Sequence, residues 1–128
     1  MKNILTIILT AAVLIITFNA CNKNNSNDPK TCNLSKQTSV SEDMTITFSA
    51  TQTGDGIIES LTYKVGSNEN TVDNPTLPWQ VDVEVSAATE ISIEANGKTT
   101  NGSLKVMMKG STATSTIEAS DYCEQQSN

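Results

Sequence analysis

Residue types that commonly carry out catalysis are unevenly represented in this 128-residue chain. It contains 14 Asp and Glu residues but no His, which excludes Ser–His and Cys–His nucleophilic pairs. Asp82 and Glu84 alternate on one predicted strand, and Glu90 and Glu94 on the next, so we expect all four on a solvated face. Two carboxylates about 5 to 9 Å apart can hydrolyse a glycoside. A carboxylate-based hydrolase and a cation site are therefore the alternatives to a simple solvated surface.

Two oxygen-rich loops, residues 53–56 and 69–74, are further candidates for binding a cation. Neither has the fixed ligand spacing of an EF-hand loop. Their Gly, Asn and Asp residues are also typical of ordinary turns. We interpret both loops as turns and expect no metal and no cofactor.

The N-terminus has the features of an export signal. Lys2 is followed by an apolar run, residues 4–16, and a small residue, Ala20, precedes Cys21. This run is shorter than the roughly 20 residues that a membrane-spanning helix needs. An uncleaved N-terminal anchor and plain secretion are the alternatives to a removed signal.

The residues around Cys21 resemble the lipobox of bacterial lipoproteins, in which a cysteine after a small residue is lipidated and becomes the new N-terminus. The resemblance implies that residues 1–20 are a lipoprotein signal peptide and that Cys21 carries the lipid. The membrane would then be a partner through this N-terminal anchor. Asn22, rather than Asp, follows the cysteine, which by analogy with enteric lipoproteins favours the outer membrane of the bacterial cell envelope.

The charge balance narrows the range of partners. The formal net charge is −6, and the chain has no Arg. Nucleic-acid binding relies on clustered Lys and Arg, so we expect no nucleic-acid partner. There is no polybasic patch for anionic lipid either.

Two further cysteines, Cys32 and Cys123, lie near the two ends of the exported chain. In an oxidising compartment such a pair predicts a disulfide, which would tie both ends to one edge of the domain. Two free buried thiols are the alternative. Two thiols without histidine do not complete a zinc site.

Composition divides the exported chain into a tether and a domain. Leu34 is the only large apolar residue between Asn22 and Lys36, so we predict an Asn-rich flexible tether over residues 21–40. Residues 41–128 show short alternating runs separated by turn residues, with Asn96-Gly97 and Asn101-Gly102 as hairpin signals. The fold prediction is all-β, a single immunoglobulin-like β-sandwich of about seven strands.

The clearest predicted strand covers residues 79–85. Trp79, Val81, Val83 and Val85 share one face, so we expect a central strand with that face toward the core. Trp79 is the only tryptophan, and it is either a core aromatic or a recognition residue. Leu61, Tyr63 and Val65 are expected to be buried on another strand. Met107 is expected to face outward, as a weaker candidate for a contact surface.

Four stretches, residues 45–65, 76–79, 91–95 and 102–110, resemble the extracytoplasmic domain of the MmpS family, the small mycobacterial membrane proteins. Leu77-Pro78-Trp79 is the sharpest of the shared motifs. The resemblance implies a small β-sandwich outside a membrane that assists a large transporter exporting lipids or siderophores. In that family a cysteine at about the position of Leu104 pairs near the end of the domain, where Cys123 stands here with Cys32 as a substitute partner.

The sequence therefore predicts a non-enzymatic, lipid-anchored protein of the cell envelope that acts as a binding or assembly module. Its partner would be a protein or an envelope polymer. An MmpS-like accessory subunit of an envelope transporter is the alternative function.

Overall fold

The computed structural model describes residues 27–127, and every helix or strand assigned in that range is a β-strand. Eight strands are present, one more than the approximate number expected. They are β1 (Lys30–Ser39), β2 (Met44–Gly54), β3 (Ile57–Val65), β4 (Asn68–Asp73), β5 (Trp79–Val85), β6 (Glu90–Thr99), β7 (Gly102–Ser111) and β8 (Thr116–Gln125).

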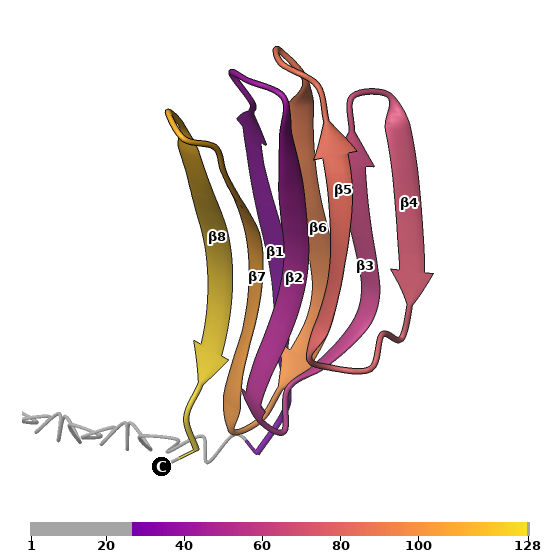
Figure 1. The fold of residues 1–128 in the computed structure, drawn as a ribbon. Helices are drawn as coiled ribbons and strands as arrows, with labels where there is room; N and C mark the ends of the chain where they lie inside the picture. The colour runs from indigo at the N-terminus through magenta and orange to yellow at the C-terminus, as the bar shows by residue number, and fades with distance from the viewer. Residues whose placement is uncertain (1–26, 128) are drawn as a thin grey trace, which may run out of the picture.

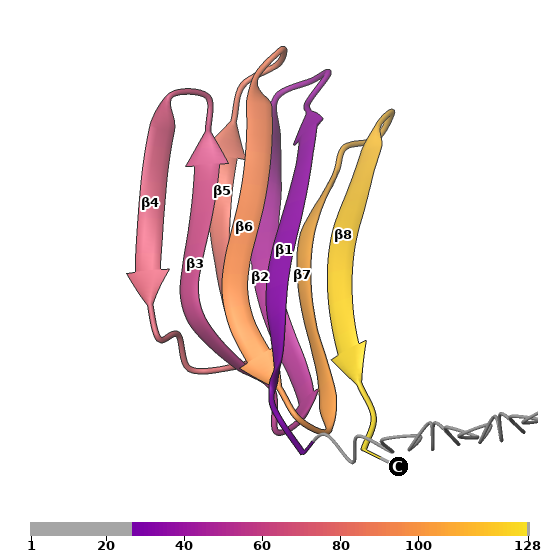
Figure 2. The same ribbon diagram turned by 180° about the vertical axis from the view of Figure 1, so that it is seen from behind.

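The strands form two four-stranded antiparallel sheets that pack face to face. One sheet has the order β1-β6-β3-β4 and the other β5-β2-β7-β8. Figure 1 shows the two layers, with β8 and β4 at opposite sides of the molecule, and Figure 2 shows the same arrangement from behind. The prediction of an all-β sandwich is confirmed.

The centre of each sheet matches the immunoglobulin arrangement, in which the second strand pairs with the fifth and the third with the sixth in opposite sheets. Here β2 pairs with β5, and β3 pairs with β6. The outer strands differ, because β1 lies beside β6 and β7 lies beside β2. In an immunoglobulin constant domain the first strand lies beside the second instead. The first and seventh strands have therefore exchanged sheets relative to that fold.

The core lies between the sheets and follows the alternation of the central strands. Inward residues of β2, β6 and β7 are almost fully shielded from solvent, whereas their neighbours along each strand face out. Leu104, Val106 and Met108 face in, and Met107 faces out as expected. The innermost side chains include Ile46, Phe48, Leu61, Ile91, Ile93, Leu104, Val106 and Met108.

The predicted tether over residues 21–40 is wrong for its second half. Residues 30–39 form β1, which pairs with β6 along its whole length. Cys32 and Leu34 are buried, and so is Val40 just after the strand. The strand is polar because it is an edge strand that needs few inward apolar residues, so its composition resembles that of a linker. Residues 21–26 of the predicted tether and residue 128 lie outside the described range.

The hairpin expected at Asn96-Gly97 is absent, because β6 continues through both residues to Thr99. Gly97 lies between Cys32 of β1 and Ile58 of β3 in the sheet. A Cβ at this position would collide with the carbonyl oxygen of Ile57, so glycine here permits a close approach of two backbones. The turn expected around Asn101 is present between β6 and β7.

A β-bulge changes the phase of β3. Its pairing with β6 shifts between Ile58 and Ser60, so Ile58 points into the core while Ile57 is 47% exposed. Beyond the bulge, Leu61 is buried as expected. Tyr63 and Val65 also face inward but are only half-buried, because they lie near one side of the sandwich.

Candidate functional site

The two sides of the sandwich are built differently. We call the side formed by β1 and β8 the closed edge, and the side formed by β4 and β5 the open edge. The backbones of β1 and β8 approach each other closely across the sandwich, whereas those of β4 and β5 stay farther apart. The open edge is therefore the wider side and the better candidate for a binding site.

A disulfide between Cys32 of β1 and Cys123 of β8 joins the sheets at the closed edge. The two Cα atoms are 5.8 Å apart, within the usual range for a disulfide, and the residues are separated by 91 positions in sequence. The predicted pairing is confirmed. It ties the first and last strands of the domain together.

Hydrogen bonds reinforce the closed edge. The Asp121 carboxylate accepts a bond from the Ser35 backbone N–H at 3.0 Å, and the Lys30 ammonium donates to the Glu124 carbonyl at 3.0 Å. Asp121 points inward, because it pairs with buried Val106, and Lys36 points inward opposite Ile93. Inward charges of this kind hinder the pairing of a further strand with an edge.

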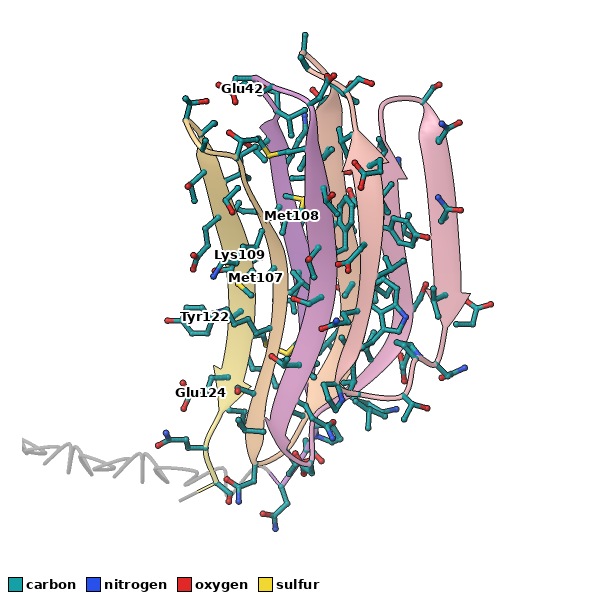
Figure 3. All side chains as sticks on the ribbon, in the orientation of Figure 1. Glu42, Met107, Met108, Lys109, Tyr122 and Glu124 are labelled. Atoms are coloured by element: carbon teal, nitrogen blue, oxygen red, sulfur yellow. A yellow bond between two sulfur atoms is a disulfide. The ribbon has the colours of Figure 1, made fainter. Side chains whose placement is uncertain are left out.

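The closed edge is also fastened at one end of the sandwich. Glu42, in the loop between β1 and β2, accepts hydrogen bonds from the hydroxyls of Thr112 (2.7 Å) and Thr114 (2.8 Å) in the turn between β7 and β8. These bonds, that of Thr112 first, lower the pKa of Glu42. Figure 3 shows Glu42 at this end of the molecule.

The open edge lacks such fastening. In residues 27–127, no hydrogen bond, ion pair or disulfide joins β4 to β5. The strand containing Trp79, predicted to be central, is an edge strand, because β5 has β2 on one side only. Alternation shows that one face of a strand is buried, but it does not reveal how many neighbours the strand has.

A row of three aromatic side chains leads from the core to the open edge. The ring centroid of Phe48 is 5.2 Å from that of Tyr63, which is 5.7 Å from that of Trp79. Phe48 is fully buried, whereas Tyr63 and Trp79 are half-buried and pack against the core from outside. Trp79 lies directly opposite Ala50, whose small side chain leaves room for the indole. Trp79 thus both packs on the core and lies at its accessible side.

Two hollows lie along the open edge. The larger has a volume of about 530 Å³, and its lining includes Tyr63, Val65, Asn68, Asn70, Val83 and Glu84. The smaller, about 360 Å³, lies between the start of β3 and the segment joining β4 to β5, and its lining includes Ile57, Ile58, Pro75 and Leu77. The smaller hollow is lined mainly by apolar groups, whereas the lining of the larger is mainly polar with a minority of apolar side chains.

The four carboxylates expected on one face lie on two. Asp82 and Glu84 face out from β5, whereas Glu90 and Glu94 face out from β6 in the other sheet. All four are exposed to solvent as expected, but on two separate outer faces, because the chain crosses between the sheets after β5. Asp82 accepts a 2.6 Å hydrogen bond from Thr47, and Glu84 one of 2.6 Å from Thr45.

The two oxygen-rich loops serve as parts of the fold. Asp55 accepts bonds from the Thr99 hydroxyl and from the N–H groups of Thr100 and Asn101, each at 2.8 to 2.9 Å. The Asn101 N–H is the largest cause of a lowered pKa at Asp55. Residues 68–73 form β4 rather than a turn. Within residues 27–127, no group of three or more His, Cys, Asp or Glu residues is placed to hold a metal ion.

Two features of the surface escaped sequence analysis. Asn70 lies in a segment predicted to be a turn, yet Asn68 and Asn70 pair with Val65 and Tyr63 and so face the larger hollow. Tyr122 is 70% exposed on the outer face of β8, where it projects from the sandwich (Figure 3). Its orientation follows from alternation once Cys123 is known to point inward. Predicted lipidation at Cys21 lies outside the described residues.

Comparison with known proteins adds no relative. No family model matches the chain, and searches of curated proteins and of solved structures found no match. Between residues 27 and 127 there is no helix of the length and apolar character needed to cross a membrane.

Proposed function

We propose that this chain is a lipid-anchored protein of the cell envelope whose β-sandwich is a non-enzymatic module for binding or assembly. Residues 1–20 are the signal peptide, Cys21 carries the lipid, and the open edge binds the partner. The lipobox-like sequence around Cys21 supports the anchor. Binding is supported by one observation above all, the half-buried aromatic and apolar row at an edge that the protein leaves unfastened.

The contrast between the edges supports a binding role. Trp79, Val81 and Val83 face inward on β5 but are only half-buried. A partner bound at the open edge would therefore remove their remaining apolar surface from water. The domain already fastens its other edge with a disulfide. Leaving apolar surface exposed at one edge is typical of an interaction site.

The anchor is tested by the intact mass of the protein purified from its native membrane. We expect a mass that begins at Cys21 and includes acyl chains, and the Cys21→Ser variant should leave the membrane fraction. A wholly soluble mature wild-type protein would contradict the anchor.

Binding is tested by photo-cross-linking in intact cells. A photo-reactive benzoylphenylalanine replaces Asn70 at the open edge or, as a matched control, Ser120 on the outer face of β8. We expect one discrete adduct from position 70 and none from position 120. Absence of adducts at position 70, with normal export and folding, would contradict the binding role of this edge.

An MmpS-like accessory subunit of an envelope transporter is the second candidate. Leu104 lies directly opposite Cys123 in the pairing of β7 with β8. In the MmpS pattern a cysteine near this position pairs toward the end of the domain, so the register favours the comparison. Loss of lipid or siderophore export in a deletion strain would support this function, and a normal export profile would contradict it.

A further inference from the structure

The open edge offers backbone as well as side chains for recognition. Because β5 has β2 on one side only, alternate residues of Trp79–Val85 direct their N–H and C=O groups away from the sheet. Among residues 27–127 those groups have no partner strand, so they can pair with an added strand. Main-chain pairing of this kind is an established way to bind an extended peptide.

The space beside β5 is matched to one additional strand. In Figures 1 and 2, β4 extends beyond β5 at this side of the molecule, so the outermost strand of one sheet has no strand directly opposite it. The inward residues Asn68 and Asn70 of β4 are accordingly exposed. A strand added to β5 would lie opposite β4 and cover the larger hollow.

The inner face of β5 lacks the protection found at the closed edge. Lys36 and Asp121 point inward at the closed edge, whereas Trp79, Val81 and Val83 point inward on β5. An added strand with apolar residues at alternate positions would pack against these side chains and against Tyr63. The remaining residues of the added strand would face outward.

Charge on the outer face decides which strand fits. Asp82 and Glu84 face out from β5 and are held in place by hydrogen bonds from Thr47 and Thr45. An added strand would place its outward residues beside these carboxylates, so Lys or Arg there would be favoured. Antiparallel pairing of two β5 strands would set carboxylate against carboxylate. A second copy of this chain is therefore disfavoured.

From these observations we infer that β5 binds an extended polypeptide segment in which apolar residues alternate with Lys or Arg, as a fifth strand of the β5-β2-β7-β8 sheet. The inference rests on the proposed binding function and specifies its partner. Apolar side chains of the segment enter the space between β5 and β4. Its basic side chains lie beside Asp82 and Glu84.

The test uses two acetylated and amidated heptapeptides, one alternating valine with lysine and one alternating valine with glutamate. Trp79 is the only tryptophan, so its fluorescence reports directly on the open edge of the purified full-length protein. We expect the lysine peptide to give a saturable change and to bind at least about tenfold tighter than the glutamate peptide. Equal affinity, or no change with either peptide, would overturn the inference.

Charge-reversal variants locate the contact. Asp82→Lys with Glu84→Lys should invert the preference, so that the glutamate peptide binds more tightly. The matched control is Glu118→Lys with Glu124→Lys, which changes net charge equally on the outer face of β8. The control should keep the preference for lysine. An inversion in both double variants would show a general charge effect and overturn the inference.

Backbone pairing is tested with two further lysine peptides, N-methylated at the valines or at the lysines. An added strand uses the N–H groups of only one of its edges, so one peptide should lose at least about tenfold in affinity and the other should retain binding. Retention by both would show that the backbone is not paired and would overturn strand addition. Val81→Lys, which introduces an inward charge into β5, should weaken the lysine peptide similarly.

Failure of this inference is distinguishable from failure of the proposed function. A cross-linked adduct at position 70 without binding of the lysine peptide would mean that the edge binds a partner of another class, such as an envelope polymer. That result overturns the strand-addition inference alone. Absence of the adduct contradicts the binding role itself.

Discussion

The two edges of this sandwich differ in how the sheets are held together. Each edge consists of the outermost strand of both sheets. The unpaired backbone groups and the inward side chains of these strands lie near water. At the closed edge, a disulfide and side-chain hydrogen bonds hold β1 and β8 together, and inward charges hinder the pairing of a further strand. At the open edge, no hydrogen bond, ion pair or disulfide joins β4 to β5 in the part of the chain that the structure describes, and aromatic and aliphatic side chains are only half-buried. We propose from this difference that the closed edge contributes more to stability and that the open edge is the binding site.

Removing the disulfide at the closed edge should have the largest effect on the stability of the domain. We expect Cys32→Ala with Cys123→Ala to lower the free energy of unfolding by about 2–5 kcal/mol, because the bridge constrains a long loop in the unfolded chain. Urea denaturation of the double variant and of the wild type, with and without reductant, measures the loss. An unchanged midpoint would show that the closed edge does not depend on the bridge.

Substitution of two tyrosines should have smaller effects on stability that differ between the two edges. Tyr63 is half-buried beside Phe48 and Trp79, so Tyr63→Ala should cost about 1–3 kcal/mol of unfolding free energy. Tyr122 is 70% exposed, and Tyr122→Ala should change stability by less than about 0.5 kcal/mol.

The same two variants test which edge binds the partner. Tyr63→Ala should also reduce cross-linking from position 70, whereas Tyr122→Ala should leave it unchanged. Equal effects of the two substitutions on cross-linking would contradict a site at the open edge.

A smaller effect on stability is expected at low pH, where the Glu42 carboxylate near the closed edge becomes protonated. The pKa of Glu42 is lowered in the folded protein by hydrogen bonds from Thr112 and Thr114. Its stabilising contribution is therefore complete above the ordinary carboxylate pKa and is lost as the pH falls through the lower, folded-state pKa. At pH 7 Glu42→Gln should unfold more easily than the wild type, and this gap should narrow below about pH 4.

Glu90→Gln is the matched control for this pH series, because the Glu90 side chain makes no hydrogen bond within the described residues. Thermal unfolding of the three proteins between pH 7 and pH 3 measures the effect. A gap for Glu42→Gln that is constant over this range would contradict the assigned role of its ionised carboxylate.

The sequence predicted features that depend on local pattern. Alternation identified the inward face of β5 and the outward position of Met107, and Cys32 and Cys123 predicted the disulfide. Prediction from the sequence failed where the structure of a segment depends on its neighbouring strands in the sheet. The polar composition of β1 concealed a strand that pairs with β6, and Gly97 looked like a turn although it lies between two strands.

The open edge was inaccessible to sequence analysis for the same reason. The pattern of β5 shows one apolar face, but its position at the end of a sheet depends on strand order. Asn68 and Asn70 resemble turn residues, and only their pairing with β3 shows that they face the hollow. Trp79 was recognised as either a core or a recognition residue. In the structure it is half-buried and packs beside Tyr63 at the open edge.

Amide hydrogen exchange of the purified protein, measured residue by residue, tests the central claim most directly. We expect the edge amides of β4 and β5 to exchange faster than those of β1 and β8, because within residues 27–127 no hydrogen bond, ion pair or disulfide joins β4 to β5. Addition of the lysine peptide should slow exchange in β5 and leave β8 unchanged. Equal protection at the two edges, or protection of β8 rather than β5 by the peptide, would contradict the account.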